Sequence, residues 1–257
     1  MSKRTTRAYG WIKDKPDARD RAWRPRVAPT GLPDTVDLSG ACPGVYDQLD
    51  IGSCTANAIG AGFEFDQMRQ KAKVFTPSRL FIYFNEREME GTTNEDSGAS
   101  IRDGIKSVAK LGVCPEDMWV YDREILFSKP PEACYKAALD SQVISYMRVD
   151  QTVTMMRTCL AEGFPFVAGF MVYPSFESKK VASTGTASMP SLIDRIQGPV
   201  GGHAVLVVGY DQIRATWLIR NSWGVKWGKA GYFSLPYAYL ADRKLASDFW
   251  TIRTVEG

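Results

Sequence analysis

The first half of the chain carries apolar residues every three to four positions, which is the period of a helix with one buried face. After Ser53 these positions form an apolar face that consists of Ala58, Ile59, Gly62, Phe63 and Phe65. A second helix is expected to begin at Pro77 behind Thr76, because a threonine cap followed by proline suits a helix start. The five expected helices cover residues 53–69, 77–91, 100–112, 131–140 and 152–162.

The second half changes to short runs of β-branched and aromatic residues bounded by glycine, proline or aspartate, which is typical of strands. The runs are "PFVAGFMV", "HAVLVVGY", "TWLIRN", "GYFSL" and "DFWTIR". Helices followed by strands predict an α+β fold in which a helical lobe lies beside an antiparallel β lobe. A cleft between two such lobes is a common place for a functional site.

Two segments fall outside this pattern. Residues 1–31 are rich in charge and proline and are expected to be extended or irregular, whereas residues 178–202 form a long irregular stretch before the next strand. Loops of that length in a compact domain are often functional. The chain is therefore divided into an N-terminal extension, residues 1–31, and one domain, residues 32–257.

Composition and charge narrow the function. The chain has 257 residues, 44% of them hydrophobic, and a net charge of +3. This weak positive charge and the lack of a basic run argue against nucleic acid as a partner, and no apolar stretch approaches membrane-spanning length. The N-terminus has no apolar segment typical of a signal peptide, so a cytoplasmic location is expected.

Cysteine and histidine are sparse. The five cysteines stand at positions 42, 54, 114, 134 and 159, and His203 is the single histidine. Without a C-x-x-C pair or clustered histidines, no metal site is expected, and the chemistry considered below needs no cofactor. Cys114 and Cys134 are candidates either for a disulfide or for reduced buried thiols, while Cys42 and Cys159 are interpreted as structural.

The segment "YDQLDIGSCTAN" places Cys54 at the first turn of the first expected helix. The partial positive charge of a helix N-terminus favours a thiolate, so the pKa of this thiol is expected to be lowered. The backbone N–H of Cys54 supplies one donor for an oxyanion. Gln48, six residues earlier, offers a side-chain amide as the second donor.

His203 is the only imidazole that can assist this thiol. It begins one expected strand, and Asn221 ends the next. If the two strands form a hairpin, the Asn221 amide can orient the imidazole ring. Trp223 follows two residues later and is placed to shield that hydrogen bond from water.

These segments together resemble the papain-like cysteine peptidases. "YDQLDIGSCTANA" resembles the family's glutamine-to-cysteine segment, "GGHAVLVVGYD" its histidine strand, and "LIRNSWGVKWGKAGYFSL" its Asn-Ser-Trp-Gly segment. The resemblance extends over most of residues 32–257 and implies the two-lobed papain fold. It also implies Cys54 as nucleophile, His203 as acid and base, Asn221 as orienter and Gln48 as oxyanion donor. Trp223 is implied both as shield and as a substrate-binding wall on the leaving-group side.

The sequence also departs from the usual pattern. The position three before the nucleophile is Ile51 rather than cysteine, and the position after it is Thr55 rather than tryptophan. These features resemble the bacterial-type branch of the family, and no long helical propeptide is recognisable. The family's substrate-binding strand corresponds loosely to "EDSGASIRDG", which makes Gly98 and Ala99 candidates for backbone contacts with substrate; an ordinary tight turn is the alternative.

The side-chain pocket is expected to have Ala204 as one wall and Ser247 near its floor. Small neutral residues at these positions predict that an apolar substrate side chain is accepted. The resulting hypothesis is a cysteine endopeptidase that hydrolyses peptide bonds through an acyl-enzyme, with peptides or proteins as substrates. A transpeptidase or ligase on the same scaffold, a non-catalytic binding protein and a redox thiol protein are the alternatives, and any inhibitor protein is unknown.

A last hypothesis concerns the extension, residues 1–31. It contains Tyr9, Trp11 and Trp23, and exposed aromatic side chains of this kind usually pack on something. Its prolines keep it extended, as suits a segment lying in a groove. We expect it to dock across or beside the cleft and to restrain activity, in place of a propeptide. One alternative is that the extension is a strap that packs on the back of the β lobe. A competing candidate for a lid over the cleft is the stretch of residues 178–202, which precedes His203.

Overall fold

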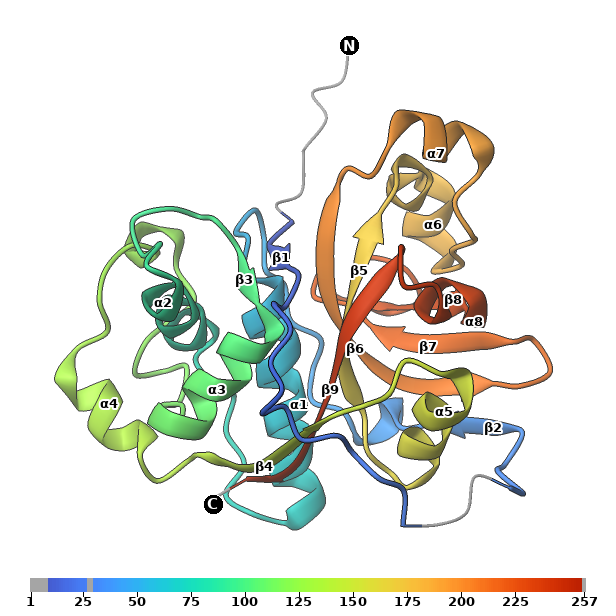
Figure 1. The fold of residues 1–257 in the computed structure, drawn as a ribbon. Coiled ribbons are helices and arrows are strands. Elements are labelled where there is room, and N and C mark those ends of the chain that lie inside the picture. The colour runs from blue at the N-terminus through green and yellow to red at the C-terminus, as the bar shows by residue number, and fades with distance from the viewer. Residues whose placement is uncertain (1–8, 27–29, 256–257) are drawn as a thin grey trace.

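The computed structural model describes residues 9–26 and 30–255. Helix α1 (Cys54–Gln70) runs between a group of helices on one side and a β-sheet on the other (Figure 1). It is buried along almost its whole length, including its polar residues Asn57, Asp66 and Gln67. The buried surface of α1 is therefore wider than the apolar face expected from the sequence. The reason is that α1 contacts both lobes and is buried on all sides.

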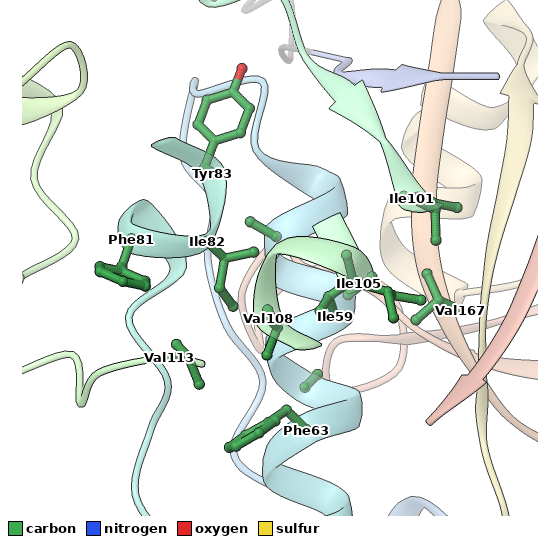
Figure 2. Packing of buried hydrophobic residues seen from close by; sticks show 14 of the residues in the cluster. Ile59, Phe63, Phe81, Ile82, Tyr83, Ile101, Ile105, Val108, Val113 and Val167 are labelled. Carbon is green, nitrogen blue, oxygen red and sulfur yellow. The ribbon is translucent and has the colours of Figure 1, made fainter. Parts of the chain in front are cut away.

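The helical lobe consists of α1, α2 (Arg79–Glu90), α3 (Ile101–Leu111) and α4 (Glu132–Ala138), with the short strand β3 (Ala99–Ser100) leading into α3. In its core, Ile105 and Val108 of α3 point toward Ile59 of α1 (Figure 2). Val167 of the sheet lies beside Ile101 and Ile105 in the same view. The two lobes thus share one apolar core cluster, to which Leu206 and Ile252 of the sheet also belong.

The β lobe is a seven-stranded sheet in the order β4-β9-β5-β6-β7-β8, and β2 also pairs with β6. All of these pairings are antiparallel. The strands are β2 (Thr35–Asp37), β4 (Val143–Arg148), β5 (Phe166–Val172), β6 (Gly201–Asp211), β7 (Thr216–Arg220), β8 (Tyr232–Pro236) and β9 (Ala246–Val255). Helices α5 (Val153–Ala161) and α8 (Tyr237–Ala241) complete this lobe. The predicted α+β architecture with two lobes is confirmed.

Helix boundaries follow local capping. Ser100 accepts a hydrogen bond from Asp103 N, as the sequence predicts for the start of α3. The prediction for α2 is wrong by two residues, since its cap is Ser78, which accepts from Phe81 N. Pro77 instead forms a bridge with Pro115, so the backbone is still extended there and cannot begin the helix.

Two other expectations are corrected. Residues 178–202, expected to be irregular, contain α6 (Lys179–Thr184) and α7 (Leu192–Gln197), each capped by a serine side chain. Strand β4 was not expected, because four of its six residues are only half-buried. It is ordered instead by pairing along β9.

The N-terminal segment reaches the cleft. Strand β1 (Trp11–Ile12) pairs in parallel with β3, with Trp11 opposite Ala99. Figure 1 shows β1 between the helical lobe and β5 and β6 of the sheet. Farther along, Ala22 forms a bridge with Arg148 of β4, and Trp23 is buried in the core of the β lobe. Different parts of this segment thus contact β3 of the helical lobe and β4 of the β lobe.

Candidate active site

The thiol of Cys54 is buried where α1 meets β6 of the sheet. Cys54 is the first residue of α1, so its backbone N–H belongs to the helix end that has no intrahelical acceptor. The backbone N–H of Ala204 on β6 donates to Cys54 Sγ at 3.4 Å. This contact brings the residue after His203 to the thiol, although the two lie far apart in the chain.

His203 and Asn221 are hydrogen-bonded as the sequence predicts. His203 Nε2 lies 2.8 Å from Asn221 Oδ1, and Asn221 Oδ1 also accepts from Ser222 N at 2.9 Å. The pair results from the antiparallel pairing of β6 with β7, in which Leu206 is opposite Arg220. Because Nε2 faces Asn221, Nδ1 is the ring nitrogen that points away from Asn221.

Trp223 covers this pair. Its ring stacks on His203 with centroids 4.8 Å apart and an interplanar angle of 23°. Trp227 and Phe176 pack edge-on against Trp223, and the His203 and Asn221 side chains are both buried. The stacked indole excludes water from the hydrogen bond, which strengthens it.

Gln48 is fully buried beside the Asn221 segment. Its Oε1 accepts from Ser222 Oγ at 2.6 Å and its Nε2 donates to Ile51 O at 2.9 Å. Holding Oε1 in this way leaves the amide N–H₂ group on the side of the loop that leads to Cys54. Ser222 was quoted within the Asn-Ser-Trp-Gly segment but given no role, because its contact with Gln48 exists only after folding.

Thr55, which replaces the tryptophan expected after the nucleophile, has its own partner. Its Oγ1 donates to Glu86 Oε2 of α2 at 2.5 Å. Glu86 is buried, and burial raises the pKa of its carboxyl well above the usual range. The first turn of α1 is therefore tied to α2 by a buried hydrogen bond, which the sequence did not suggest.

The N-terminal segment covers the thiol. Gly10 O accepts from Ala99 N at 2.7 Å, and a Cβ at Gly10 would lie 1.6 Å from Gly52 O. The Tyr9 ring lies edge-on to His203 and Trp223, with centroid distances of 6.0 and 6.2 Å. Residues 9–11 therefore lie over the residues that the sequence predicts to be catalytic.

The expected low pKa of Cys54 is not found in this state. Burial raises the pKa of the Cys54 thiol to about 11, although hydrogen bonds from the backbone N–H groups of Ala204, Gly10 and Thr55 oppose the rise. Removal of water from an ionisable thiol disfavours the thiolate. The helix N-terminus is in place, but its effect is outweighed while the segment excludes solvent.

The predicted substrate-binding residues line the same region. Gly98, at a positive φ of 76°, and Ala99 form the edge of the helical lobe that pairs with β1. Ala204 borders the thiol, and Ser247 lies opposite Gly169 on β5. The next residue, Asp248, accepts a hydrogen bond from Trp11 Nε1 at 3.2 Å.

The other cysteines and the acidic residues of the described ranges form neither a disulfide nor a metal site. In the structure all five cysteines are free thiols, so Cys114 and Cys134 are not paired. Within the described ranges no group of three or more histidine, cysteine or acidic residues is arranged to hold a metal ion. No helix in the same ranges is long and apolar enough to cross a membrane.

Comparison with known proteins agrees with this geometry. The sequence profile described as "Papain family cysteine protease" matches residues 32–247. The crystal structure of xylellain, a cysteine protease from Xylella fastidiosa, superposes with a TM-score of 0.90 at 44% identity, covering 100% of this chain and 99% of that one. The uncharacterized peptidase C1-like protein L477 of Acanthamoeba polyphaga mimivirus is 40% identical, over 97% of this chain and 88% of its own length. Cathepsin B-like CP3 of Giardia intestinalis is 29% identical over 84% and 74%.

Proposed function

Because the chain belongs to the papain family of cysteine proteases, we propose that Cys54 is its nucleophile, His203 its acid and base, and Asn221 the residue that orients His203. The protein is a cysteine peptidase, and its substrates are peptides or proteins. The observation that carries the assignment is the pair of contacts from Ala204 N to Cys54 Sγ, 3.4 Å, and from His203 Nε2 to Asn221 Oδ1, 2.8 Å.

In the proposed reaction the Cys54 thiolate attacks the carbonyl carbon of the scissile bond. The new C–S bond places negative charge on the carbonyl oxygen, which the backbone N–H of Cys54 and the Gln48 amide would stabilise. The His203 imidazolium gives its proton to the leaving amine as the C–N bond breaks. Water, deprotonated by His203, then attacks the thioester, releases the carboxylic acid and regenerates the thiolate.

Asn221 and Trp223 would act through His203. The Asn221 amide oxygen accepts from the protonated Nε2 and so directs Nδ1 toward the thiol. Trp223 keeps water from this hydrogen bond. Within the described residues no feature favours the ligase, binding-protein or redox alternatives over hydrolysis.

Labelling and turnover together test this assignment. An epoxide or iodoacetamide reagent should modify Cys54 and abolish cleavage of a fluorogenic peptide in parallel. Peptide mapping should locate one modified thiol per inactivated molecule. Loss of activity with Cys54 unmodified would contradict the nucleophile assignment, and transfer of the acyl group to an added amine in place of water would favour a ligase.

We further propose that the extension, residues 1–31, forms a restraint distinct from the peptidase domain, residues 32–257. Its support is the position of residues 9–11 over Cys54 and His203. Its N–H and C=O groups take the place that a substrate backbone would need at Ala99. Deleting residues 1–31 should raise kcat/KM for a small fluorogenic peptide. If the truncated enzyme folds but its kcat/KM does not rise, the segment is a structural strap and not a restraint.

A further inference from the structure

We propose that helix α7 (Leu192–Gln197) is a docking site outside the cleft, which binds an aliphatic or aromatic segment of a protein substrate beyond the leaving-group side of the scissile bond. The inference rests on the proposed function, because it takes the covered cleft to be the place where the bond is cleaved. It gives protein substrates a second contact that small peptides lack.

Helix α7 buries its charged residue and exposes its aliphatic ones. Asp194 is 4% exposed, whereas Leu192, Ile193 and Ile196 are 74%, 67% and 77% exposed. Among the described residues, only one other large hydrophobic side chain, that of Ile213, is as exposed as these. A surface helix usually does the opposite and turns its apolar side to the core, so this arrangement indicates that the aliphatic side chains have a partner.

The three exposed side chains form one surface, the aliphatic face of α7, which consists of Leu192, Ile193 and Ile196. Positions i, i+1 and i+4 of a helix lie within about 100° of one another around its axis, because a turn has about 3.6 residues. Val200, which is also exposed, follows between α7 and the start of β6. Covering such a face with apolar side chains is favourable in proportion to the apolar area removed from water.

Asp194 fixes the orientation of α7 and so keeps the aliphatic face outward. Its Oδ2 accepts from Ser191 N at 2.9 Å and from Ser191 Oγ at 2.7 Å, and its Oδ1 accepts from Ser175 N at 3.0 Å. Turning the helix to bury the aliphatic face would break these bonds, and a buried carboxylate without its donors is unfavourable. The fold therefore maintains the exposed face by hydrogen bonds to a buried charge.

A short 3-10 helix, η3 (Pro174–Glu177), connects α7 to the cleft. Ser175 of η3 holds Asp194 of α7, as described above. Glu177 of the same element accepts through Oε1 from the Tyr9 hydroxyl at 2.7 Å. Figure 1 shows α7 at the top of the β lobe, in the connection between β5 and β6. The aliphatic face is thus attached to the element that contacts residue 9 of the docked segment.

Tyr9 marks the leaving-group side of the cleft. Its ring lies edge-on to His203 and Trp223, and in the proposed reaction His203 gives its proton to the leaving amine. A Cβ at Gly201, the first residue of β6, would lie 2.6 Å from Tyr9 Cβ. Because Val200 and α7 come just before Gly201 in the chain, a substrate that leaves the cleft on this side continues toward the aliphatic face.

The composition of the chain's own N-terminal residues does not match this face. Residues 1–8, which precede Tyr9, read MSKRTTRA and contain three basic residues and one large apolar residue, Met1. Charged groups lose hydration without compensation when they are placed on an apolar surface. The matching partner is an apolar segment of another chain, and the connection to the cleft assigns that chain to the substrate.

Matched fluorogenic peptides test the site on the full chain carrying Gly10→Ala. This substitution is incompatible with the docked position of residue 10, because its Cβ would lie 1.6 Å from Gly52 O. The peptides share the residues around the scissile bond, followed on the leaving-group side by a flexible Gly-Ser spacer made in several lengths. Beyond the spacer one peptide carries Leu-Leu-Ala-Leu and the other Ser-Ser-Ala-Ser.

With a spacer that reaches α7, kcat/KM should favour the leucine peptide by about tenfold, which corresponds to about 1.4 kcal/mol. The gain should be in KM, since a contact made equally in the bound substrate and in the transition state leaves kcat unchanged. Ile193→Gln together with Ile196→Gln should bring the ratio of the two peptides close to one.

Ile213→Gln is the matched control, because Ile213 is similarly exposed but follows the opposite end of β6, and it should leave the ratio unchanged. All three isoleucines are exposed, so glutamine should not disturb the fold. A ratio near one at every spacer length overturns the proposal, as does a preference that survives the double substitution. A preference that appears only in kcat overturns docking outside the cleft.

A binding measurement separates this proposal from the proposed function. In the full chain with both Gly10→Ala and Cys54→Ala, fluorescence polarisation should show tighter binding of the leucine peptide than of the serine peptide, by a similar factor. Preferential binding together with absent turnover in the enzyme that retains Cys54 would contradict the catalytic assignment and support the docking site. Equal binding of the two peptides would overturn the docking site whatever the turnover.

Two further measurements address other occupants of the aliphatic face. In sedimentation velocity the Gly10→Ala chain should be a monomer, and in flotation it should not bind vesicles of anionic phospholipid. A dimer that Ile193→Gln with Ile196→Gln dissociates would assign the face to a second copy of this chain and overturn the proposal. Vesicle binding that the same double substitution abolishes would assign the face to a lipid surface and likewise overturn it.

Discussion

At the scale of single residues, the chemistry depends on a few contacts that connect distant segments. Cys54, Gln48 and Asn221 are each buried and each held by a backbone or side-chain hydrogen bond from another part of the chain. Such contacts preorganise donors before the substrate arrives, which is where most electrostatic stabilisation of a transition state comes from. Predictions at this scale therefore concern rate rather than fold.

Replacing the nucleophile is the first such prediction. Cys54→Ala should abolish turnover, because it removes the thiol that we propose forms the acyl-enzyme, while the melting temperature stays close to that of the wild type. Cys42→Ala is the control, since that thiol contacts Leu38 O and Tyr232 and its loss should leave kcat unchanged. Residual turnover well above background in purified Cys54→Ala would show that the nucleophile is elsewhere.

Gln48→Ala should lower kcat by about 10²–10³-fold with little change in KM, as is usual for the loss of one oxyanion donor. Steady-state kinetics on a small peptide measures both constants. Gln70→Ala removes an amide that only bonds Val255 O at the end of α1 and should change neither. An effect confined to KM would assign Gln48 to substrate binding.

His203→Ala should lower the alkylation rate of Cys54 steeply at mildly acidic pH, because an imidazolium next to a thiol favours the thiolate. The measurement is the iodoacetamide rate between about pH 5 and pH 8 in the chain without residues 1–31, where solvent reaches the thiol. An unchanged rate near pH 5 would mean that the thiolate does not depend on His203.

At the scale of elements, the N-terminal segment is held by buried charges. Asp14 Oδ2 accepts from Trp250 Nε1 at 2.8 Å and Asp14 Oδ1 accepts from Arg102 N at 3.1 Å. Asp20 pairs with Arg102 and Arg148 at 3.2 Å each. The segment therefore contributes its own acidic residues to the surface of the peptidase domain.

This arrangement makes docking dependent on pH. Burial and, next in size, the nearby Asp248 carboxylate raise the pKa of Asp14 to about 6, while hydrogen bonds from Arg102 N and Trp250 oppose the rise. The docked state therefore binds a proton more tightly than the undocked state. Docking is strongest below the ordinary pKa of 3.8 and weakens as the pH rises from there through about 6.

Asp14→Asn should remove this dependence. As the pH rises from about 4 to about 7, the melting temperature of the wild type should fall relative to that of the variant. Asp17→Asn is the control: hydrogen bonds from Arg19 hold the pKa of Asp17 below its usual value, so its contribution is constant over that range. A pH-independent difference for Asp14→Asn would show that the carboxyl does not titrate on docking.

At the scale of the whole molecule, residues 9–26 pack against both lobes. Gly10 approaches Gly52 so closely that no side chain fits between them, whereas Gly40 has no atom within 4 Å of a Cβ position. Gly10→Ala should displace the segment and readmit water to the thiol, so that the pKa of Cys54 falls and kcat/KM rises by about tenfold or more, which corresponds to about 1.4 kcal/mol of lost docking.

Peptide turnover and the alkylation rate of Cys54 by iodoacetamide at neutral pH measure this change. Gly40→Ala should leave both unchanged. If Gly10→Ala folds normally and shows the wild-type rates in both assays, the segment does not limit access to the thiol.

Much of this protein follows from its sequence alone. The apolar periods predict most of the helices and strands, apart from β1, β3, β4, α8 and the helices of residues 178–202. The separated segments around Cys54, His203 and Asn221 predict the family and the arrangement of the site. These features are readable because each depends on residue types at short spacing: a thiol at a helix start, or a histidine and an asparagine on successive strands.

Tertiary structure alone decided the rest. The raised pKa of Cys54, the role of Ser222 in holding Gln48, and the carboxylate of Asp248 beneath Trp11 all depend on segments far apart in the chain. The pKa of a thiol is set by how much water surrounds it as well as by the helix it begins, and water was excluded here by residues 9–11. The contact between Asp248 and Trp11 has a similar origin: the register of β9 shifts against β5 between Val167 and Gly169, which the alternation of residues in β9 does not reveal.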